Sequence, residues 1–249
     1  MDRMLYLSMN GAKRLMQSQS VNSNNLANVS TAGFKADYHV FKSMPVEGPT
    51  YPSRVYSESS GLAVDLTPGP VKSTGRDLDI VVRGEGYIAV QSNDAGQTEG
   101  YTRAGSLRVN EAGQLVTSSN HLVLGNAGGP ISIPPYEKLE IAGDGTITIL
   151  PVGQEATTLA VVDRIKLVKI PHEDVAKGED GLLHNIQESD TPPDASVQVE
   201  SGFLEGSNVS GIGAMVEMIA LSRQYEMQVK MMSTADEVAR AGEGLMRLG

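Results

Sequence analysis

A heptad pattern at both ends of the 249-residue chain constrains its fold more than any other feature. Near the N-terminus, spacings of 4, 3, 4, 3, 4 and 3 connect Leu5, Met9, Ala12, Met16, Gln19, Ser23 and Leu26. Near the C-terminus, the same spacings connect Met218, Ser222, Tyr225, Val229, Met232, Asp236 and Ala239. This period is typical of coiled-coil seams. We therefore predict two long terminal helices that pair as a coiled coil, although an amphipathic helix packed on its own domain would show the same period.

The residues that flank the two heptad patterns indicate where the helices begin and end. We expect the first helix from about residue 3 to 28, because Gly33 can adopt the left-handed turn that closes a helix. For the last helix, Ser207, Asn208 and Ser210 are suitable N-cap residues. Gly211 and Gly213 each cost about 1 kcal/mol relative to Ala inside a helix. The last helix is therefore expected to begin after these glycines or to bend there.

The chain between the two helices has the signals of a β domain. From Leu78 to about Glu205, short apolar and β-branched runs alternate with turns that contain glycine. The clearest hairpin signal is Gly143-Asp144-Gly145, which separates two runs of alternating polarity. Five prolines between residues 36 and 76 disfavour a helix there. We predict an α+β fold made of four segments. The N-terminal helix of an inner helical domain takes up residues 1–35, and an extended connector follows over residues 36–76. A central all-β domain of many short strands spans residues 77–205, and the C-terminal helix of the helical domain spans residues 206–249.

The composition disfavours several kinds of partner. The formal net charge of −10 and the pI near 4.9 disfavour nucleic acid, because its phosphate backbone is also negative. Without any Cys, the chain has no thiol catalysis, Cys-ligated metal or disulfide. No segment approaches the roughly 20 apolar residues that span a bilayer, so we expect no membrane insertion. The N-terminal residues also lack the pattern of a cleaved secretory signal.

No catalytic or cofactor motif is recognisable in the sequence. The four histidines lie in segments of different character: His39, His121, His172 and His184. A zinc-protease helix would need a second histidine one turn after His172, and none is there. Asp77 and Asp79 could begin a calcium loop, but its other ligands are missing. We therefore predict no enzyme activity, no cofactor and no metal, while the 30 acidic residues leave a glycosidase-type carboxylate pair open as an alternative.

Four phrases of the sequence are similar, in order, to the signatures of one protein family. They are Asn25-Leu26-Ala27-Asn28 with Thr31, Gly33, Phe34 and Lys35; the segment from Thr74 to Tyr87; the segment from Tyr101 to Val116; and Gly202-Phe203-Leu204-Glu205-Gly206-Ser207-Asn208-Val209 with Arg223-Gln224-Tyr225-Glu226. Together these phrases cover essentially the full length. The chain therefore resembles the flagellar basal-body rod and hook proteins.

The resemblance implies a structural subunit of the bacterial flagellar rod, assembled helically around the export channel and transmitting motor torque. The length and the connector after Phe34 are most similar to the proximal-rod members, with the distal-rod members as the alternative. The implied partners are other rod proteins, copies of the chain itself and, during assembly, the flagellar type III export apparatus. The implied location is the periplasmic span of the basal body, reached without a cleaved signal peptide. A wall-lytic enzyme and a self-contained monomeric binding module are the two rival functions.

The predicted assembly interface follows the two heptad patterns and the first family phrase. It comprises Leu5, Met9, Ala12, Met16, Leu26, Asn28, Phe34, Met215, Met218, Tyr225, Val229 and Met232. Methionine is frequent in this set, and its flexible thioether side chain adapts to partners of different shape. Ordinary core filling is the simpler explanation for any one of these methionines.

Overall fold

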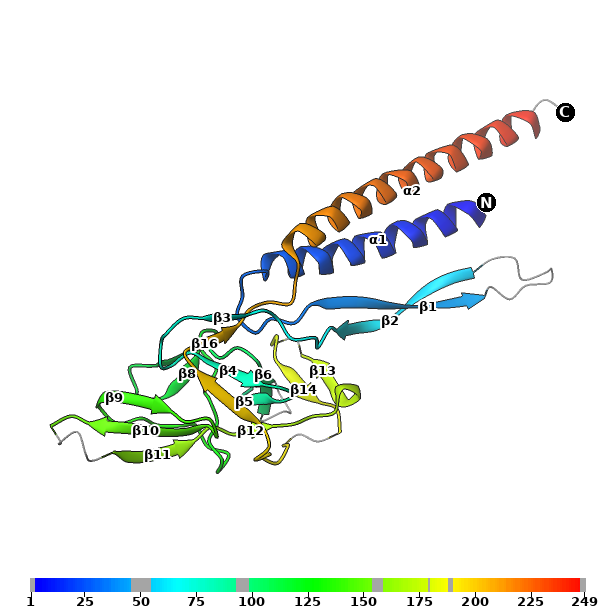
Figure 1. Cartoon of the computed structure of the whole chain (residues 1–249). Coiled ribbons are helices and arrows are strands. Elements are labelled where there is room, and N and C mark those ends of the chain that lie inside the picture. Colours follow the sequence, from blue (N-terminus) through cyan, green and yellow to red (C-terminus); the bar gives the residue numbers. More distant parts are fainter. Residues whose placement is uncertain are drawn as a thin grey trace. The chain divides into compact units, whose positions relative to one another are not determined.

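The computed structural model describes residues 3–45, 55–92, 99–153, 159–178, 180–187 and 190–246 (Figure 1). The chain divides into two compact units. The helical unit consists of Met1–Val29, Ala36–Asp65 and Val209–Gly249, and the β unit consists of Ser30–Lys35 and Leu66–Asn208. The N-terminal part of the chain thus contributes six residues to the β unit before it returns to the helical unit.

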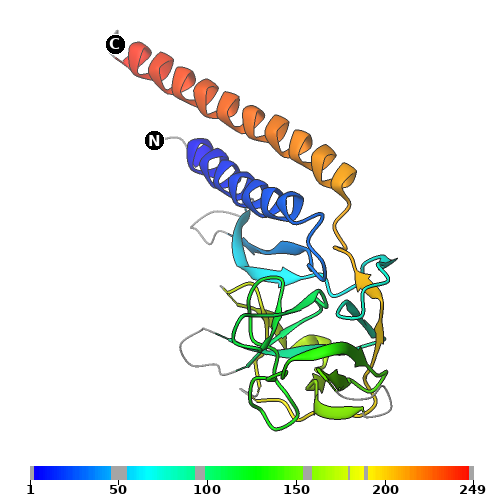
Figure 2. The same cartoon turned by 90° about the vertical axis from the view of Figure 1, so that its left-hand side faces the viewer.

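The helical unit is built from two helices and a hairpin. Helix α1 (Arg3–Ala27) has 25 residues and helix α2 (Gly211–Met246) has 36. Strand β1 (Asp37–Pro45) pairs antiparallel with β2 (Val55–Val64), with a bulge between Val40 and Phe41. Figures 1 and 2 both show α1 between α2 and this hairpin. The hairpin lies within the segment that the sequence predicts to be an extended connector.

Helix α2 begins directly after Ser210, one of the three predicted N-cap residues. Its first residue is Gly211, so both glycines lie in its first turn rather than before it. The hydroxyl of Ser210 accepts a hydrogen bond from the Gly213 N–H at 3.2 Å. Because this hydroxyl satisfies one of the free N–H groups at the helix start, it offsets part of the cost of the two glycines.

The predicted coiled coil between the terminal helices is wrong. A coiled coil inserts large seam side chains into holes of the facing helix, but the predicted seam residues Met9, Met16 and Val229 are 54%, 58% and 42% exposed. The buried side chains of the two helices are mostly small or polar: Ser8, Ala12, Asn25, Ala214, Leu221 and Ala235. One contact between the two helices is polar, because the Asn22 amide of α1 donates to the Ala214 carbonyl of α2 at 2.7 Å.

A second neighbour also prevents α1 from acting as one strand of a simple coiled coil. On its hairpin side, the Asn25 side chain exchanges two hydrogen bonds with the Asp37 backbone, at 2.7 and 2.9 Å. The Arg14 guanidinium lies 4.5 Å from the centre of the Phe41 ring. Helix α1 is therefore the middle layer of a small three-layer arrangement, which the heptad period alone does not specify.

The β unit confirms the predicted β-rich middle of many short strands, and the α+β class is confirmed with it. Its strands are β3 (Val71–Ser73), β4 (Ile80–Arg83), β5 (Tyr87–Gln91), β6 (Glu99–Thr102), β7 (Leu107–Val109), β8 (Leu115–Thr117), β9 (Tyr136–Ile141), β10 (Thr146–Pro151), β11 (Ala160–Arg164), β12 (Leu167–Val168), β13 (Val175–Lys177), β14 (Leu183–Asn185), β15 (Gln198–Ser201) and β16 (Phe203–Glu205), with one turn of 3₁₀ helix, η1 (His172–Asp174). The predicted hairpin at Gly143–Gly145 joins β9 to β10.

These strands form small antiparallel sheets around one apolar core. The largest sheet has the order β12-β5-β6-β14-β13, and a three-stranded sheet has the order β11-β10-β9. Three strand pairs complete the unit: β15–β4, β16–β3 and β7–β8. Inward-facing residues of several sheets meet in the centre, where Ile88, Leu107, Ile147 and Ile165 are completely buried. Side chains of this size contribute about 1.5–3 kcal/mol each when fully buried.

Candidate functional site

The two family phrases at opposite ends of the chain meet at Glu205, inside the β unit. The Glu205 carboxylate is 2% exposed and accepts hydrogen bonds from the Lys35 ammonium at 2.6 Å and the Gly69 N–H at 3.0 Å, both at Oε1. The Arg103 guanidinium donates to Oε2 at 3.0 Å. Two cations and one anion are thus buried together, and the carboxylate holds three chain segments at one point.

The ionic surroundings keep Glu205 ionised in spite of its burial. Burial alone would raise the pKa of this carboxyl group, because it penalises the charged form. The hydrogen bonds from Lys35 and Gly69 and the charges of Lys35 and Arg103 outweigh it, and the pKa of Glu205 lies below its ordinary value. A buried charge that is fully paired in this way costs the fold far less than an unpaired one.

Backbone contacts reinforce the same junction. The Gly33 N–H donates to the Glu205 carbonyl at 2.8 Å, and the Gly206 N–H donates to the Pro70 carbonyl at 2.8 Å. Gly33 has φ +69°, and a Cβ atom there would lie 2.3 Å from the Ala104 nitrogen. Glycine is therefore required at position 33 both for its left-handed backbone and for the close approach to residues 103 and 104.

The aromatic residue of the first family phrase is also fixed within the β unit. The Lys177 ammonium lies 4.2 Å from the centre of the Phe34 ring, a cation–π contact. The Asn208 N–H donates to the Phe34 carbonyl at 3.3 Å. Phe34 was predicted to lie in the assembly interface, and the structure places its half-buried ring on the β unit.

The other predicted interface residues lie in the helical unit with different degrees of exposure. Ala12 is buried, and six are half-buried: Leu5, Leu26, Asn28, Met218, Tyr225 and Met232. Met9, Met16, Met215 and Val229 are exposed. Of the 22 large apolar side chains that are exposed among the described residues, 17 belong to the helical unit. Apolar surface of this extent on long helices is typical of surfaces that a partner covers.

A second buried polar cluster lies in the five-stranded sheet of the β unit. The Lys166 ammonium contacts both oxygens of Glu99, at 2.7 and 3.0 Å, and also Asp190. Burial raises the pKa of Glu99, and Lys166 opposes part of that effect. The His184 nitrogens lie 3.2 Å from the Glu99 carbonyl oxygen and 3.1 Å from Asp180. These groups serve as hydrogen-bond partners and counter-charges for one another, so the cluster is a structural polar network within the β unit.

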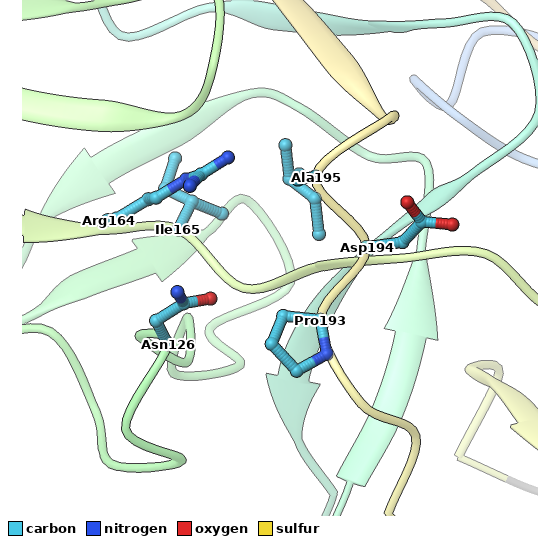
Figure 3. Close-up of a pocket in the computed structure, with 7 residues that line it drawn as sticks. Asn126, Arg164, Ile165, Pro193, Asp194 and Ala195 are labelled. Carbon is cyan, nitrogen blue, oxygen red and sulfur yellow. The ribbon is translucent and has the colours of Figure 1, made fainter.

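The described residues offer little that resembles a substrate or metal site. A pocket of about 70 Å³ is lined by Asn126, Arg164, Ile165, Leu167, Pro193, Asp194 and Ala195 (Figure 3). It has room for little more than water, whereas ligand pockets usually measure about 300–1,000 Å³. No group of three or more His, Asp or Glu residues in the described parts of the chain could hold a metal ion. Within those same parts, no helix has the length and apolar character needed to cross a membrane.

Lys35 and Glu205 lie in two separate family phrases, and the sequence does not predict that their side chains form an ion pair. They are 170 positions apart, and Arg103, their third partner, lies in another phrase. The available signal was the opposite charge of two residues in segments rich in glycine and small side chains. Local pattern gives no distance information over such separations, so the pairing required the structure.

Comparisons with known proteins agree with this arrangement. Three family models match: one described as "Flagella basal body rod protein" over residues 5–35, one as "Flagellar hook protein FlgE/F/G D1 domain" over residues 81–149, and one as "Flagellar basal body rod FlgEFG protein C-terminal" over residues 200–245. The first and third matches contain Lys35 and Glu205 respectively. The second covers Arg103.

Full-length relatives carry the same family description. The flagellar basal-body rod protein FlgF of Escherichia coli is 40% identical over 254 residues, with 100% of both chains covered. FlgF of Salmonella typhimurium is 39% identical over 95% of both chains, and the rod protein FlgG of Bacillus subtilis is 31% identical over 98% of this chain and 99% of its own. The predicted family is confirmed: the chain belongs to the flagellar basal-body rod proteins, as a FlgF-like structural subunit of the rod.

Proposed function

We propose that the chain is a subunit of the proximal part of the flagellar rod, where it assembles helically with copies of itself and with other rod proteins. The observation that supports this most is the full-length similarity to FlgF proteins, at 40% identity without loss of either end. The FlgG protein of Bacillus subtilis is 31% identical, about as similar as FlgF of Caulobacter vibrioides at 32%, so a distal position is the alternative. Interfaces that repeat head to tail without closing into a ring build such a rod.

The exposed faces of α1 and α2 are the surface that we assign to assembly, together with the half-buried residues beside them. Met9 and Met16 lie one heptad apart on α1, and Met215 and Val229 expose apolar side chains on α2. Burying a fully exposed side chain of this kind contributes about 1.5–3 kcal/mol. Covering several such partly exposed residues in each subunit therefore contributes favourably to association between neighbours. Ala12, by contrast, is already buried within the subunit, so it is not available to a neighbouring subunit.

The β unit supplies a rigid body for this assembly. Its apolar core is fully buried, and the Lys35–Glu205–Arg103 cluster joins its chain ends at one point. Packed interiors transmit strain because they are dense and have little room to deform. We infer that a subunit of this kind passes motor torque to its neighbours through the rod.

Export and location follow from the same proposal. The subunit reaches the periplasmic span of the basal body through the flagellar type III export apparatus, and it associates with that apparatus only during assembly. Its role is structural rather than catalytic. A muralytic assay on the purified chain tests that point, since reproducible wall cleavage abolished by one carboxylate substitution would establish a wall-lytic enzyme instead.

The decisive experiment is a density map of the native basal body with this chain traced in it. The expected result is a set of copies in the proximal rod, with the exposed faces of α1 and α2 covered by neighbouring subunits. Complementation gives an independent test, because the chain should restore rods in a strain without its FlgF protein but not in one without its FlgG protein. Copies traced only in the distal rod, or rescue of the second strain alone, would replace the proximal assignment by a distal one.

A further inference from the structure

The methionines of this chain are confined to one of its two units. All eleven lie in the three segments of the helical unit, and the β unit has none. The chain also has no Cys and no Trp, so methionine is its only readily oxidised sulfur side chain. Core packing does not explain this distribution, because the larger core belongs to the β unit, which is filled without methionine.

Several of these methionines present their thioethers to solvent. Four on the helices are more than half exposed: Met9 and Met16 on α1, and Met215 and Met227 on α2. Met218 and Met232 on α2 are half-buried and provide a comparison within the same helix. Met9 and Met16 are seven residues apart, so they lie on the same face of α1.

We propose that the exposed methionines form an oxidation-sensitive surface that controls whether the subunit can assemble. A two-electron oxidant such as hydrogen peroxide transfers one oxygen atom to the thioether sulfur. The O–O bond of the peroxide breaks, an S–O bond forms, and the second peroxide oxygen leaves as water. The sulfur loses two electrons, and the peroxide gains them. The product is methionine sulfoxide, which methionine sulfoxide reductases can convert back to the thioether.

The consequence for assembly rests on the proposed function, in which neighbouring subunits cover these helix faces. A sulfoxide replaces an apolar, flexible group by a strongly polar one. Covering that group without a hydrogen-bond partner is unfavourable, so the oxidised face should resist burial between subunits. A subunit already in the rod would have its thioethers covered, and would therefore be protected. The surface thus distinguishes free subunits from assembled ones.

The reactivity of the surface can be measured on the purified full-length chain. After brief exposure to dilute hydrogen peroxide, peptide mapping by mass spectrometry should find sulfoxide first at Met9, Met16, Met215 and Met227. Met218 and Met232 should react several-fold more slowly because they are partly covered. The thermal unfolding of the β unit should not change, since that unit contains no methionine. Equal rates at all six positions, or oxidation confined to the half-buried pair, would overturn the inference.

The effect on assembly is tested with basal bodies purified from a strain that lacks its FlgF protein. The unoxidised chain should sediment with them, and the oxidised chain should sediment roughly tenfold less. A variant with Met9, Met16, Met215 and Met227 all replaced by Leu should sediment equally before and after peroxide. Each variant is compared with its own unoxidised sample, and the matched control, with Met218 and Met232 replaced by Leu, should lose sedimentation on oxidation as the wild type does. These swaps conserve volume, so the fold should tolerate them.

The outcomes of this experiment separate the two proposals. Failure of the unoxidised chain to sediment would count against the proposed function, while the order of oxidation in the free chain would still decide whether the sensitive surface exists. Equal sedimentation of the oxidised and unoxidised wild-type chains would overturn the assembly consequence alone. Persistent sensitivity of the fourfold Leu variant would show that other groups respond to peroxide, and would overturn the assignment to these methionines.

Discussion

The two units of this protein are stabilised in different ways. The β unit buries Ile, Leu and Val side chains completely, and its few buried charges are paired. The helical unit buries mainly small or polar groups such as Ser8 and Ala12, and it exposes most of its large apolar side chains. The β unit therefore has the interior of a self-contained domain, whereas the helical unit has an apolar surface of the kind that partners usually cover.

The net charge is also distributed unevenly between the two units. The helical unit contains 10 acidic and 9 basic residues, which leaves 20 acidic and 11 basic residues for the β unit. Nearly the whole net charge of −10 thus belongs to the β unit. A high net charge keeps a body soluble and disfavours contact with identical copies. The nearly neutral helical unit carries no such repulsion, which is consistent with its assignment to assembly.

The largest expected effect concerns the buried charge cluster. Replacing Glu205 by Ala leaves Lys35 and Arg103 buried without their anion, so the free energy of unfolding of the β unit should fall by about 3–5 kcal/mol. Urea denaturation followed by far-ultraviolet circular dichroism measures this change. The control is Glu200→Ala, which removes an exposed pair with Arg83 and should cost at most about 1 kcal/mol. Similar losses for both variants would contradict the central role of Glu205.

A core substitution tests the contrast in packing. Ile147 is completely buried in the β unit, and Ile147→Ala should lower its free energy of unfolding by about 2–5 kcal/mol. Ile219 on α2 is 54% exposed, and Ile219→Ala should change the free energy by no more than about 0.5 kcal/mol in the isolated chain. Hydrogen exchange resolved by unit measures both. A large loss of protection from the Ile219 change would show that the helical unit has its own apolar core.

The pKa of Glu205 predicts a smaller effect that depends on pH. Its folded-state pKa is lower than its ordinary value of 4.5, so folding favours the ionised form. The stability from this group is fully present above the unfolded pKa and is lost as the pH falls through the folded pKa. The difference in unfolding free energy between wild type and Glu205→Gln should therefore shrink below pH 4.5. A difference that stays constant down to pH 3 would mean that Glu205 has the same pKa in both states.

The sequence predicts the β unit better than it predicts the helical unit, and the reason is physical. A hairpin such as β9–β10 depends on alternation and on glycine at Gly143–Gly145, which are local features. The face that a helix buries depends on its neighbours. In α1, Ala12 is buried and Asn22 bonds to α2, whereas Met9 and Met16 are exposed. The heptad period located the helices correctly but could not identify which apolar stripe is covered within the subunit.

Long-range features were the least accessible to sequence reasoning. The sequence predicts an extended connector over residues 36–76 but does not predict the pairing of β1 with β2 within it, and Pro45 is the last residue of β1. The Lys35–Glu205 pair was missed because it joins positions 170 apart. The family phrases nevertheless contained both residues. A phrase that contains a charged residue among small ones can therefore mark a buried junction, even when its partner is not visible in the sequence.

A charge on the exposed face of α2 should have the smallest effect on the stability of the free subunit but a large effect on rod assembly. Val229 is 42% exposed on α2, so Val229→Asp should change the unfolding free energy of the isolated chain by only about 0.5 kcal/mol. In the rod the same carboxylate would be covered without a partner, so motility and rod formation should be lost. The matched control is Val161→Asp, which places the same charge at the exposed position of strand β11 in the β unit and should leave motility intact. Swarming assays and counts of basal bodies in complemented strains measure both variants. Normal motility with Val229→Asp would remove this face of α2 from the interface, and loss of motility with Val161→Asp would extend the interface to the β unit.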